Sequence, residues 1–503
     1  MKTRSLSWVV GPWLLLNSYV TPVLAERPFV EQQEPVAVTE HQTRIGDRQV
    51  TYRARAGKLP IRDVGTGEIR AWMFYVAYDL KPEAGAKPRP VAFLWGGGPG
   101  GPGVPMDLSY FGPKQWRDST LSDNPASLLP AADLVFIDAI GTGFSRVTKA
   151  EFEKEFYTVR GDAASFAEFI RMWYTLYANS DAPVYVGGAS YGSWRSGIVT
   201  ELLEKSGRHV TGSLLISGGI LLGQDLLSAQ EKAAYRVPAQ AATALFHNRL
   251  DPSLGRDLDE VTAKANAWAR DTYLPALRRI DRLSKNERET IAQELSRYTG
   301  FPVDKIDRKV LAFSQPTYRD NLLPDGRKLD IMDMRRTSST SDPPEVRARI
   351  ARYVREVLRY PSELAYAGVE QGYTSQVGPE VKDLGSRWLY DTGKDNKVAP
   401  SPLNDGLGPS VGEPWILRSI AMNPALKVFV GAGLFDSMNT CFGNEASVRA
   451  IDADSARHLT TRCYINGHRM AVDPDNIARL ATDVRAFIAA PPIEAGETSG
   501  GGG

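Results

Sequence analysis

The chain has 503 residues, enough for one large domain or several ordinary ones, and its composition is that of an average folded protein. An apolar content of 42% excludes a disordered chain. The 60 lysines and arginines nearly balance the 59 aspartates and glutamates, so the basic excess that marks proteins binding nucleic acid or acidic membranes is missing.

The first 25 residues have the layout of a cleavable secretory signal peptide. Lys2 and Arg4 supply its positive end, an apolar stretch follows at 8–20, and the small residue Ala25 ends it. The alternative is an N-terminal membrane anchor, but the apolar stretch is short for a membrane span and is broken by Pro12, Asn17 and Pro22. We therefore expect residues 1–25 to be removed and the rest to be secreted or periplasmic, without a membrane span.

From about residue 48 onward, strand-like and helix-like segments alternate, which is typical of an α/β protein. Uninterrupted apolar runs indicate strands that are buried on both faces, as in a mostly parallel central sheet covered by helices on both sides. The expected strands are 49–56, 69–78, 91–95, 134–137, 184–186, 214–216 and 428–430. The expected helices outside the middle of the chain are 160–177, 193–203 and 477–488.

Between residues 224 and 425 helical patterns dominate. They occur at 258–280, 286–298 and 345–358. We interpret this block as a helical cap inserted into the α/β domain rather than as an independent domain. The expected organisation is a signal peptide at 1–25, a first core segment at 26–223, the cap at 224–425, a second core segment at 426–490 and a disordered tail at 491–503.

The chain contains two cysteines, Cys441 and Cys463. In an exported protein a single disulfide between them is the default expectation, and two buried free thiols are the alternative. Metal binding is not expected, because the five histidines are scattered without the spacing of metal ligands.

A G-x-S-x-G motif at 188–192 lies directly after an expected strand and before an expected helix. In this context the motif is typical of a nucleophile elbow, a sharp turn that lifts the serine hydroxyl clear of the sheet. The alternative is an ordinary glycine turn with an exposed serine. The pattern predicts Ser190 as a catalytic nucleophile.

Candidate partners for this serine follow later in the chain, each just past an expected strand. A serine hydroxyl is a poor nucleophile until a base removes its proton. We predict His468 as that base and Asp436 as the carboxylate that orients it and stabilises the imidazolium. Cys441 lies five residues after the aspartate and Cys463 five residues before the histidine, so a disulfide would tie the two loops together.

Residues 96–103 are all glycine or proline and directly follow the expected strand at 91–95. Such a loop can present backbone N–H groups without obstruction by side chains. We expect it to supply one donor of an oxyanion hole, and the backbone N–H of Tyr191, the residue after the nucleophile, to supply the other.

The same loop formally satisfies the dinucleotide-binding fingerprint, with glycines at 96, 98 and 101. That motif requires a helix that opens inside it, and Pro99 and Pro102 obstruct one. We therefore expect no cofactor.

Together these residues resemble the serine carboxypeptidase family, of the carboxypeptidase C or cathepsin A type and in its bacterial branch, over about residues 70–490. The segments similar to family motifs are Leu94 to Gly100, Asn124-Pro125, Ile137 to Ser145, Ser190-Tyr191-Gly192, and Gly467-His468 with Met470 and Asp473. The resemblance implies an α/β-hydrolase fold and acyl transfer through an acyl-enzyme on Ser190 without a metal. It also implies an oxyanion hole formed by the backbone N–H groups of Gly98 and Tyr191.

The sequence departs from the family pattern where the family grips the substrate's terminal carboxylate. Gly96 stands in place of an asparagine, and Ala189 and Tyr110 stand in place of glutamates. The residues for hydrolysis are therefore present, while this carboxylate-binding network is absent. We expect substrate contacts from Gly97, Ala189 and Arg195. The sequence leaves open whether Arg195 or a cation of the cap replaces the missing carboxylate anchor.

The leading hypothesis is a secreted serine carboxypeptidase that cleaves C-terminal peptide bonds. The alternative is an esterase or amidase that acts on a small acyl substrate with the same triad. A catalytically silent binding protein on a hydrolase scaffold is disfavoured because the triad is complete. The expected partner is a peptide or a small ester or amide and not nucleic acid, and the sequence leaves the oligomeric state open.

Overall fold

The computed structural model describes residues 34–81, 85–117, 120–177, 181–220, 222, 226–337, 344–367, 387–391 and 413–493. The expected signal peptide and nearly all of the expected disordered tail lie outside these residues. Within the described part of the chain, no helix is long and apolar enough to cross a membrane.

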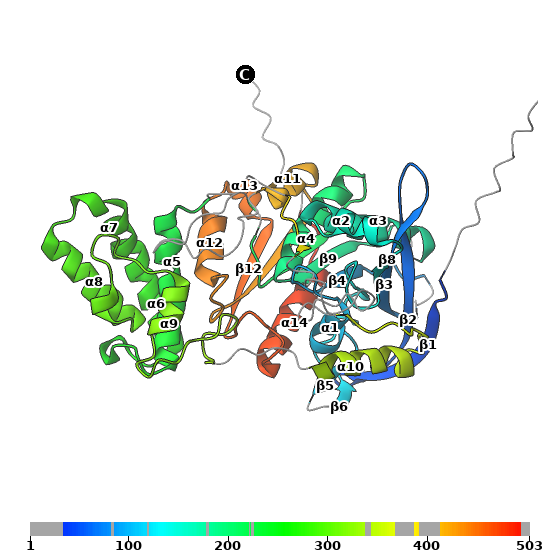
Figure 1. Cartoon of the computed structure of the whole chain (residues 1–503), viewed down its shortest axis with the longest axis horizontal. Helices are drawn as coiled ribbons and strands as arrows, with labels where there is room; N and C mark the ends of the chain where they lie inside the picture. The colour runs from blue at the N-terminus through cyan, green and yellow to red at the C-terminus, as the bar shows by residue number, and fades with distance from the viewer. Residues whose placement is uncertain are drawn as a thin grey trace, which may run out of the picture. The chain divides into compact units, whose positions relative to one another are not determined.

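The described strands form one large sheet and one small hairpin (Figure 1). The strands of the large sheet are β1 (Ala37–Ile45), β2 (Arg48–Arg62), β3 (Ile69–Leu80), β4 (Val91–Trp95), β7 (Asp133–Ile137), β8 (Arg146–Val147), β9 (Val184–Ala189), β10 (Gly212–Ile216), β11 (Lys427–Gly433) and β12 (Leu459–Tyr464). Their order is β1-β2-β3-β7-β4-β9-β10-β11-β12, with β8 paired to β3 beside this path. The hairpin consists of β5 (Lys114–Arg117) and β6 (Thr120–Asp123).

From β7 to β12 every neighbouring pair of strands is parallel, whereas β1, β2 and β3 pair antiparallel. Strands β4 and β10 bury all of their residues, because a parallel sheet is covered by helices on both faces. This arrangement confirms the predicted α/β class with a mostly parallel central sheet. The carboxyl ends of the parallel strands meet at one edge of the sheet, where loops can assemble a site.

Helices pack on both faces of the sheet and create two apolar cores. Helices α3 (Val159–Leu176), α4 (Tyr191–Lys205) and α11 (Trp415–Met422) contribute to the first core, and α14 (Pro474–Ala489) contributes to the second. Alternate residues of β4 divide between the cores, since Phe93 belongs to the first and Leu94 to the second. The short helices near the sheet are α1 (Val104–Met106), α2 (Glu153–Phe156), α12 (Cys441–Arg449) and α13 (Ala453–Ala456).

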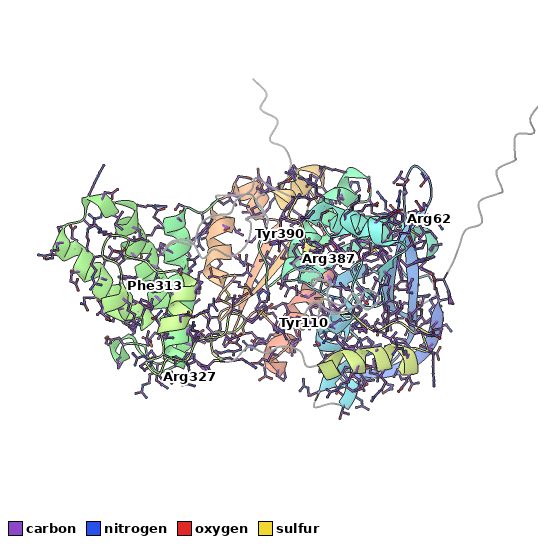
Figure 2. All side chains as sticks on the ribbon, in the orientation of Figure 1. Arg62, Tyr110, Phe313, Arg327, Arg387 and Tyr390 are labelled. Atoms are coloured by element: carbon purple, nitrogen blue, oxygen red, sulfur yellow. A yellow bond between two sulfur atoms is a disulfide. The ribbon has the colours of Figure 1, made fainter. Side chains whose placement is uncertain are left out.

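The described residues between 224 and 425 are mainly helical and form no strand of either sheet. Their helices, apart from α11, are α5 (Ala229–Phe246), α6 (Leu258–Trp268), α7 (Leu274–Arg278), α8 (Lys285–Thr299), α9 (Gln315–Asn321) and α10 (Pro344–Arg352). Helices α5 to α9 share a third apolar core, which includes Phe313 (Figure 2) and also Leu434 and Phe435 from the segment after β11. The segment at 258–280, predicted as one helix, is instead divided by a π-helical turn, because Pro275 cannot donate a backbone hydrogen bond.

Candidate active site

Ser190 lies in a sharp turn between β9 and α4, as the sequence motif predicts. Its φ of 60° and ψ of −128° are unfavourable for a residue with a side chain, and its backbone N–H donates to the carbonyl of Ile216 at 2.8 Å. Gly188 and Gly192, which flank this turn, are required because neighbouring backbone atoms leave no room for a side chain. A Cβ on Gly188 would lie 2.6 Å from the carbonyl oxygen of Gly192, and a Cβ on Gly192 would lie 2.6 Å from that of Gly96.

His468 and Asp436 lie together beyond the carboxyl ends of β12 and β11. Nδ1 of His468 is 2.8 Å from Oδ2 of Asp436, whose side chain is fully buried. The second carboxylate oxygen accepts a hydrogen bond from the backbone N–H of Met438, and the backbone N–H of His468 donates to the carbonyl of Met332. Both groups are therefore fixed, while the buried Nε2 of His468 has no hydrogen-bond partner among the described residues.

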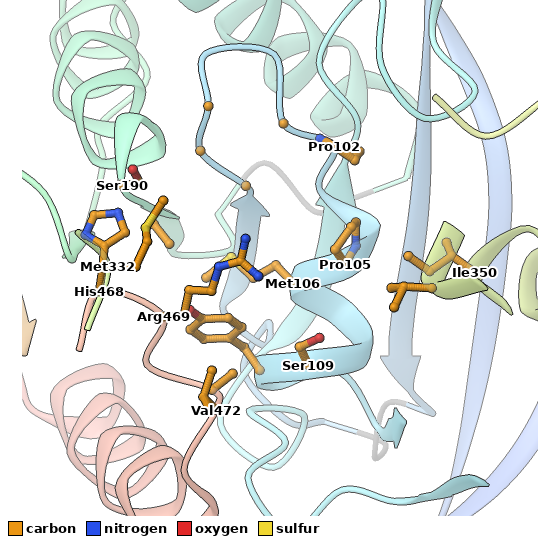
Figure 3. A pocket seen from close by; sticks show the side chains of 18 of the residues that line it. Pro102, Pro105, Met106, Ser109, Ser190, Met332, Ile350, His468, Arg469 and Val472 are labelled. Carbon is orange, nitrogen blue, oxygen red and sulfur yellow. The ribbon is translucent and has the colours of Figure 1, made fainter. Parts of the chain in front are cut away.

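Ser190 and His468 line the same cavity, which has a volume of about 480 Å³ (Figure 3). The glycine-rich loop borders it on one side, and residues of α10 border it on another. In the cavity, as in the rest of the described part of the chain, no group of three or more His, Cys, Asp or Glu side chains could hold a metal ion. The cavity thus brings together Ser190 in an unfavourable backbone conformation and an imidazole that a buried carboxylate orients.

The glycine-rich loop lies directly against Ser190. A Cβ on Gly97 would be 2.6 Å from the carbonyl oxygen of Ala189 and 2.7 Å from Cβ of Ser190, so only glycine permits this approach. Gly98 has a φ of +115°, which favours glycine. Among the described residues, neither the backbone N–H of Gly98 nor that of Tyr191 donates to a backbone carbonyl. Gly97, Gly98 and Ala189 all line the cavity.

Asp138 anchors the end of this loop, a role that the sequence analysis did not identify. Its Oδ1 accepts hydrogen bonds from the backbone N–H groups of Gly103 and Val104 and from the hydroxyl of Tyr366, which lines the cavity. The carboxyl group is fully buried, and this burial raises the pKa of Asp138 to about 6. In the sequence, an aspartate close to several glycines was the sign of such a role. Its hydrogen-bond partners could not be recognised, because they are distant in the chain.

The expectation that Arg195 faces the substrate is wrong, because its guanidinium is buried outside the cavity lining. Nε donates to Oδ2 of Asp162 at 2.7 Å, Nη2 donates to Oδ1 of the same residue at 3.1 Å, and Nη1 donates to the carbonyl of Gly96 at 2.9 Å. The guanidinium also stacks over the ring of Phe166. Arg195 therefore fixes the start of the glycine-rich loop to α3 and α4.

Two other arginines line the cavity, Arg347 in α10 and Arg469 directly after His468. Figure 3 shows Arg469 extending toward the middle of the cavity. A cation of the cap at this site was an open possibility from the sequence, but neither arginine could be singled out there. Arginine is common at surfaces, and nothing in the local sequence of either residue marks it as part of a cavity.

The predicted disulfide between Cys441 and Cys463 is present. Cys441 is the first residue of α12, and Cys463 lies in β12. The bond therefore connects the segment after Asp436 to the strand that leads to His468.

Several solved structures match this chain over most of its length at low sequence identity. A prohormone-processing carboxypeptidase from Saccharomyces cerevisiae is 15% identical, with a TM-score of 0.49 over 87% of this chain and 90% of that chain. A homoserine O-acetyltransferase from Staphylococcus aureus is 10% identical, with a TM-score of 0.33 over 87% of this chain and 96% of that chain.

Sequence comparison identifies the family. Serine carboxypeptidase-like 10 of Arabidopsis thaliana is 25% identical over 215 residues. The match covers 40% of this chain and 48% of the relative, so the chain spans about half of the length of this curated relative. The family model described as serine carboxypeptidase matches residues 62–354, more than half of the chain. With its mostly parallel sheet and its serine at the turn after β9, the chain belongs to the serine carboxypeptidase family and has an α/β-hydrolase fold.

Proposed function

We propose that this protein is an exported serine carboxypeptidase that releases C-terminal residues from peptides by using Ser190, His468 and Asp436. The observation that carries the proposal is the 2.8 Å contact between Nδ1 of His468 and the buried carboxylate of Asp436, beside a cavity that Ser190 also lines. A buried carboxylate holds the imidazole in the tautomer whose Nε2 is free to accept a proton.

In this mechanism Oγ of Ser190 attacks the scissile carbonyl carbon while Nε2 of His468 takes its proton. The resulting oxyanion would be stabilised by the backbone N–H groups of Gly98 and Tyr191. The C–N bond then breaks, and the leaving amine receives the proton from His468. Water next attacks the acyl-enzyme, with His468 again as the base, and the second product leaves with a free carboxylate.

Export is part of the proposal. The first 25 residues have the layout of a signal peptide, and the disulfide between Cys441 and Cys463 would persist in an oxidising compartment. N-terminal sequencing of the protein recovered from outside the cytoplasm should begin at Glu26. A product that retains its first 25 residues would contradict the proposed cleavage.

The test of catalysis is covalent labelling by a fluorophosphonate probe, with Ser190→Ala as the control. We expect stoichiometric labelling of the unmodified enzyme at Ser190 and none of the variant, together with release of the C-terminal residue from blocked dipeptides. Absence of labelling in a correctly folded protein would overturn the proposal and favour a silent binding protein.

An esterase or amidase activity is the second candidate, and one feature of the cavity favours it. Gly96, Tyr110 and Ala189 all line the cavity, and none of them carries a carboxyl group. The network expected to receive a terminal carboxylate is therefore lacking at these positions. Turnover of a blocked dipeptide, of its C-terminal amide and of an aryl ester should be compared. A strong preference for the free acid would eliminate the esterase hypothesis.

A further inference from the structure

We propose that Arg347 and Arg469 form a cationic subsite that selects substrates with a carboxylate on the leaving-group side of the scissile bond. This inference rests on the proposed function, because it assigns a role within the same cavity. It concerns residues that contact the substrate without taking part in the bond exchange.

The charge of the cavity lining is the first argument. Among the described residues that line the cavity, Arg347 and Arg469 carry positive charge, and no aspartate or glutamate is present. The remaining lining is mostly glycine, proline and apolar side chains, such as Met106, Met332 and Ile350 (Figure 3). Solvent screens charges less in such a cavity than on an open surface, so an anionic group that enters it is favoured.

The position of Arg469 determines which part of the substrate it meets. In acyl transfer by a serine, the leaving group takes its proton from Nε2 of the histidine, so it must lie on the histidine side of the nucleophile. Arg469 directly follows His468 in the chain, and its side chain extends from there into the cavity (Figure 3). The guanidinium therefore lies on the leaving-group side.

Another part of the cavity lining comes from α10. Val346, Arg347 and Ile350 all line the cavity, and their spacing places them on neighbouring positions of one helix face. The two arginines thus come from different parts of the chain, one from the helical block and one from the segment after β12. A carboxylate between them could accept several charge-assisted hydrogen bonds, which arginine makes in a planar, bidentate geometry.

Two sources could supply this carboxylate, namely the free C-terminus of a peptide or an acidic side chain on the leaving residue. The chemistry of recognition is the same for both. A set of substrates that share one acyl group separates the two sources. Their leaving groups are alanine, alanine amide and glutamic acid α-amide, and a neutral aryl ester of the same acyl group is the reference.

The variants are Arg347→Gln and Arg469→Gln, with Arg347→Lys and Arg469→Lys as charge-conserving forms. Arg349→Gln is the matched control, because Arg349 lies on the same helix but does not line the cavity. For each glutamine variant we expect the ratio of kcat/KM on the acid to kcat/KM on the ester to fall by about 10- to 100-fold, mainly through KM. The lysine forms should recover part of this ratio, and Arg349→Gln should keep it.

Labelling by the fluorophosphonate probe separates the possible failures. A wild-type preference for free alanine over its amide assigns the subsite to the terminal carboxylate, and a preference for the glutamic acid amide assigns it to an acidic side chain. If Ser190 is labelled and both glutamine variants keep the wild-type ratio, the cationic subsite is overturned while the proposed function stands. If Ser190 is not labelled in the wild-type protein, the proposed function itself fails.

Discussion

His468 donates a hydrogen bond from Nδ1 to the fully buried carboxylate of Asp436 over 2.8 Å. The other oxygen of this carboxylate accepts from the backbone N–H of Met438, so the acid cannot rotate without losing a partner. A buried, hydrogen-bonded acceptor of this kind determines which imidazole nitrogen carries the proton. In the proposed mechanism, Asp436 is therefore the group on which the base function of His468 depends.

Replacing Asp436 by asparagine should therefore abolish most of the activity while retaining the fold. The amide can donate a hydrogen bond to Nδ1, which would leave the proton on Nε2 and remove the base. We expect kcat to fall by about 10⁴-fold, as in serine hydrolases where the analogous change traps the wrong tautomer. Single-turnover kinetics on a neutral ester measure the loss, and circular dichroism verifies the fold. A loss of less than tenfold would contradict the assignment.

A methyl group on Gly97 should damage the site directly. It would meet the carbonyl oxygen of Ala189 at 2.6 Å and Cβ of Ser190 at 2.7 Å, so either the loop or the nucleophile must move. Gly97→Ala should reduce kcat/KM by at least about 100-fold, because a displacement of about 1 Å at the reacting atoms has this effect. Gly65→Ala is the control, since its Cβ would contact Oδ1 of Asp63 at an ordinary 3.5 Å. Equal activity of the two variants would contradict this close packing.

The central strands could be predicted from the sequence because each is buried on both faces. β4, β10 and β11 bury every residue, so their sequences are short apolar runs. β1 was not predicted, because its residues are mostly half-buried or exposed and its sequence is largely polar. The hairpin β5–β6 was missed for the same reason, since all of its described residues are at least partly exposed.

Among the site residues, too, only those whose surroundings are encoded locally in the sequence could be predicted. Ser190 could be predicted because its turn is encoded by five consecutive residues. Arg195 could not be placed correctly, because its partners Asp162 and Gly96 lie 33 and 99 residues away in the chain. An arginine near a nucleophile has the same local sequence whether it faces the substrate or a buried carboxylate. Only the packing of α3 against α4 determines this difference.

The buried pair of Arg195 and Asp162 leads to a prediction about stability. Their side chains are 0% and 3% exposed, so Arg195→Met would leave a carboxylate buried without its partner. We expect the free energy of unfolding to fall by about 3–5 kcal/mol. The surface pair of Arg297 and Glu294 is the comparison, where Arg297→Met should cost at most about 1 kcal/mol. Chemical denaturation measures both values, and equal effects would contradict the role of burial.

Loss of the disulfide should lower kcat while the domain remains folded. Cys441 and Cys463 are separated by 22 residues, and closing a loop of this length stabilises a protein by about 3 kcal/mol in the chain-entropy model. Reduction should lower kcat before the domain unfolds, because the bond restrains the segments that carry Asp436 and His468. The Cys441→Ala/Cys463→Ala variant should have this lowered kcat and should no longer respond to reductant. An unchanged kcat after complete reduction would contradict the prediction.

The buried carboxyl group of Asp138 should make stability depend on pH in mild acid. Burial raises its pKa to about 6 in the folded protein, above the 3.8 of an exposed aspartate. The folded state therefore holds this proton more tightly than the unfolded chain. The stability contributed by the protonated group is fully present below about pH 4 and is lost as the pH rises through about 6, with a total of about 3 kcal/mol.

Asp138→Asn cannot ionise and isolates this effect. The free energy of unfolding of the wild type minus that of the variant should decrease between pH 4 and about 6 and then remain constant. Asp63 provides a control of opposite sign, because hydrogen bonds from Thr66 lower its pKa. The stability that Asp63 contributes is therefore lost on acidification, whereas that of Asp138 is gained. Urea denaturation at a series of pH values measures each difference. Since Asp138 accepts hydrogen bonds from Gly103, Val104 and Tyr366, a flat difference for Asp138→Asn would contradict the raised pKa and mean that these donors offset the effect of burial.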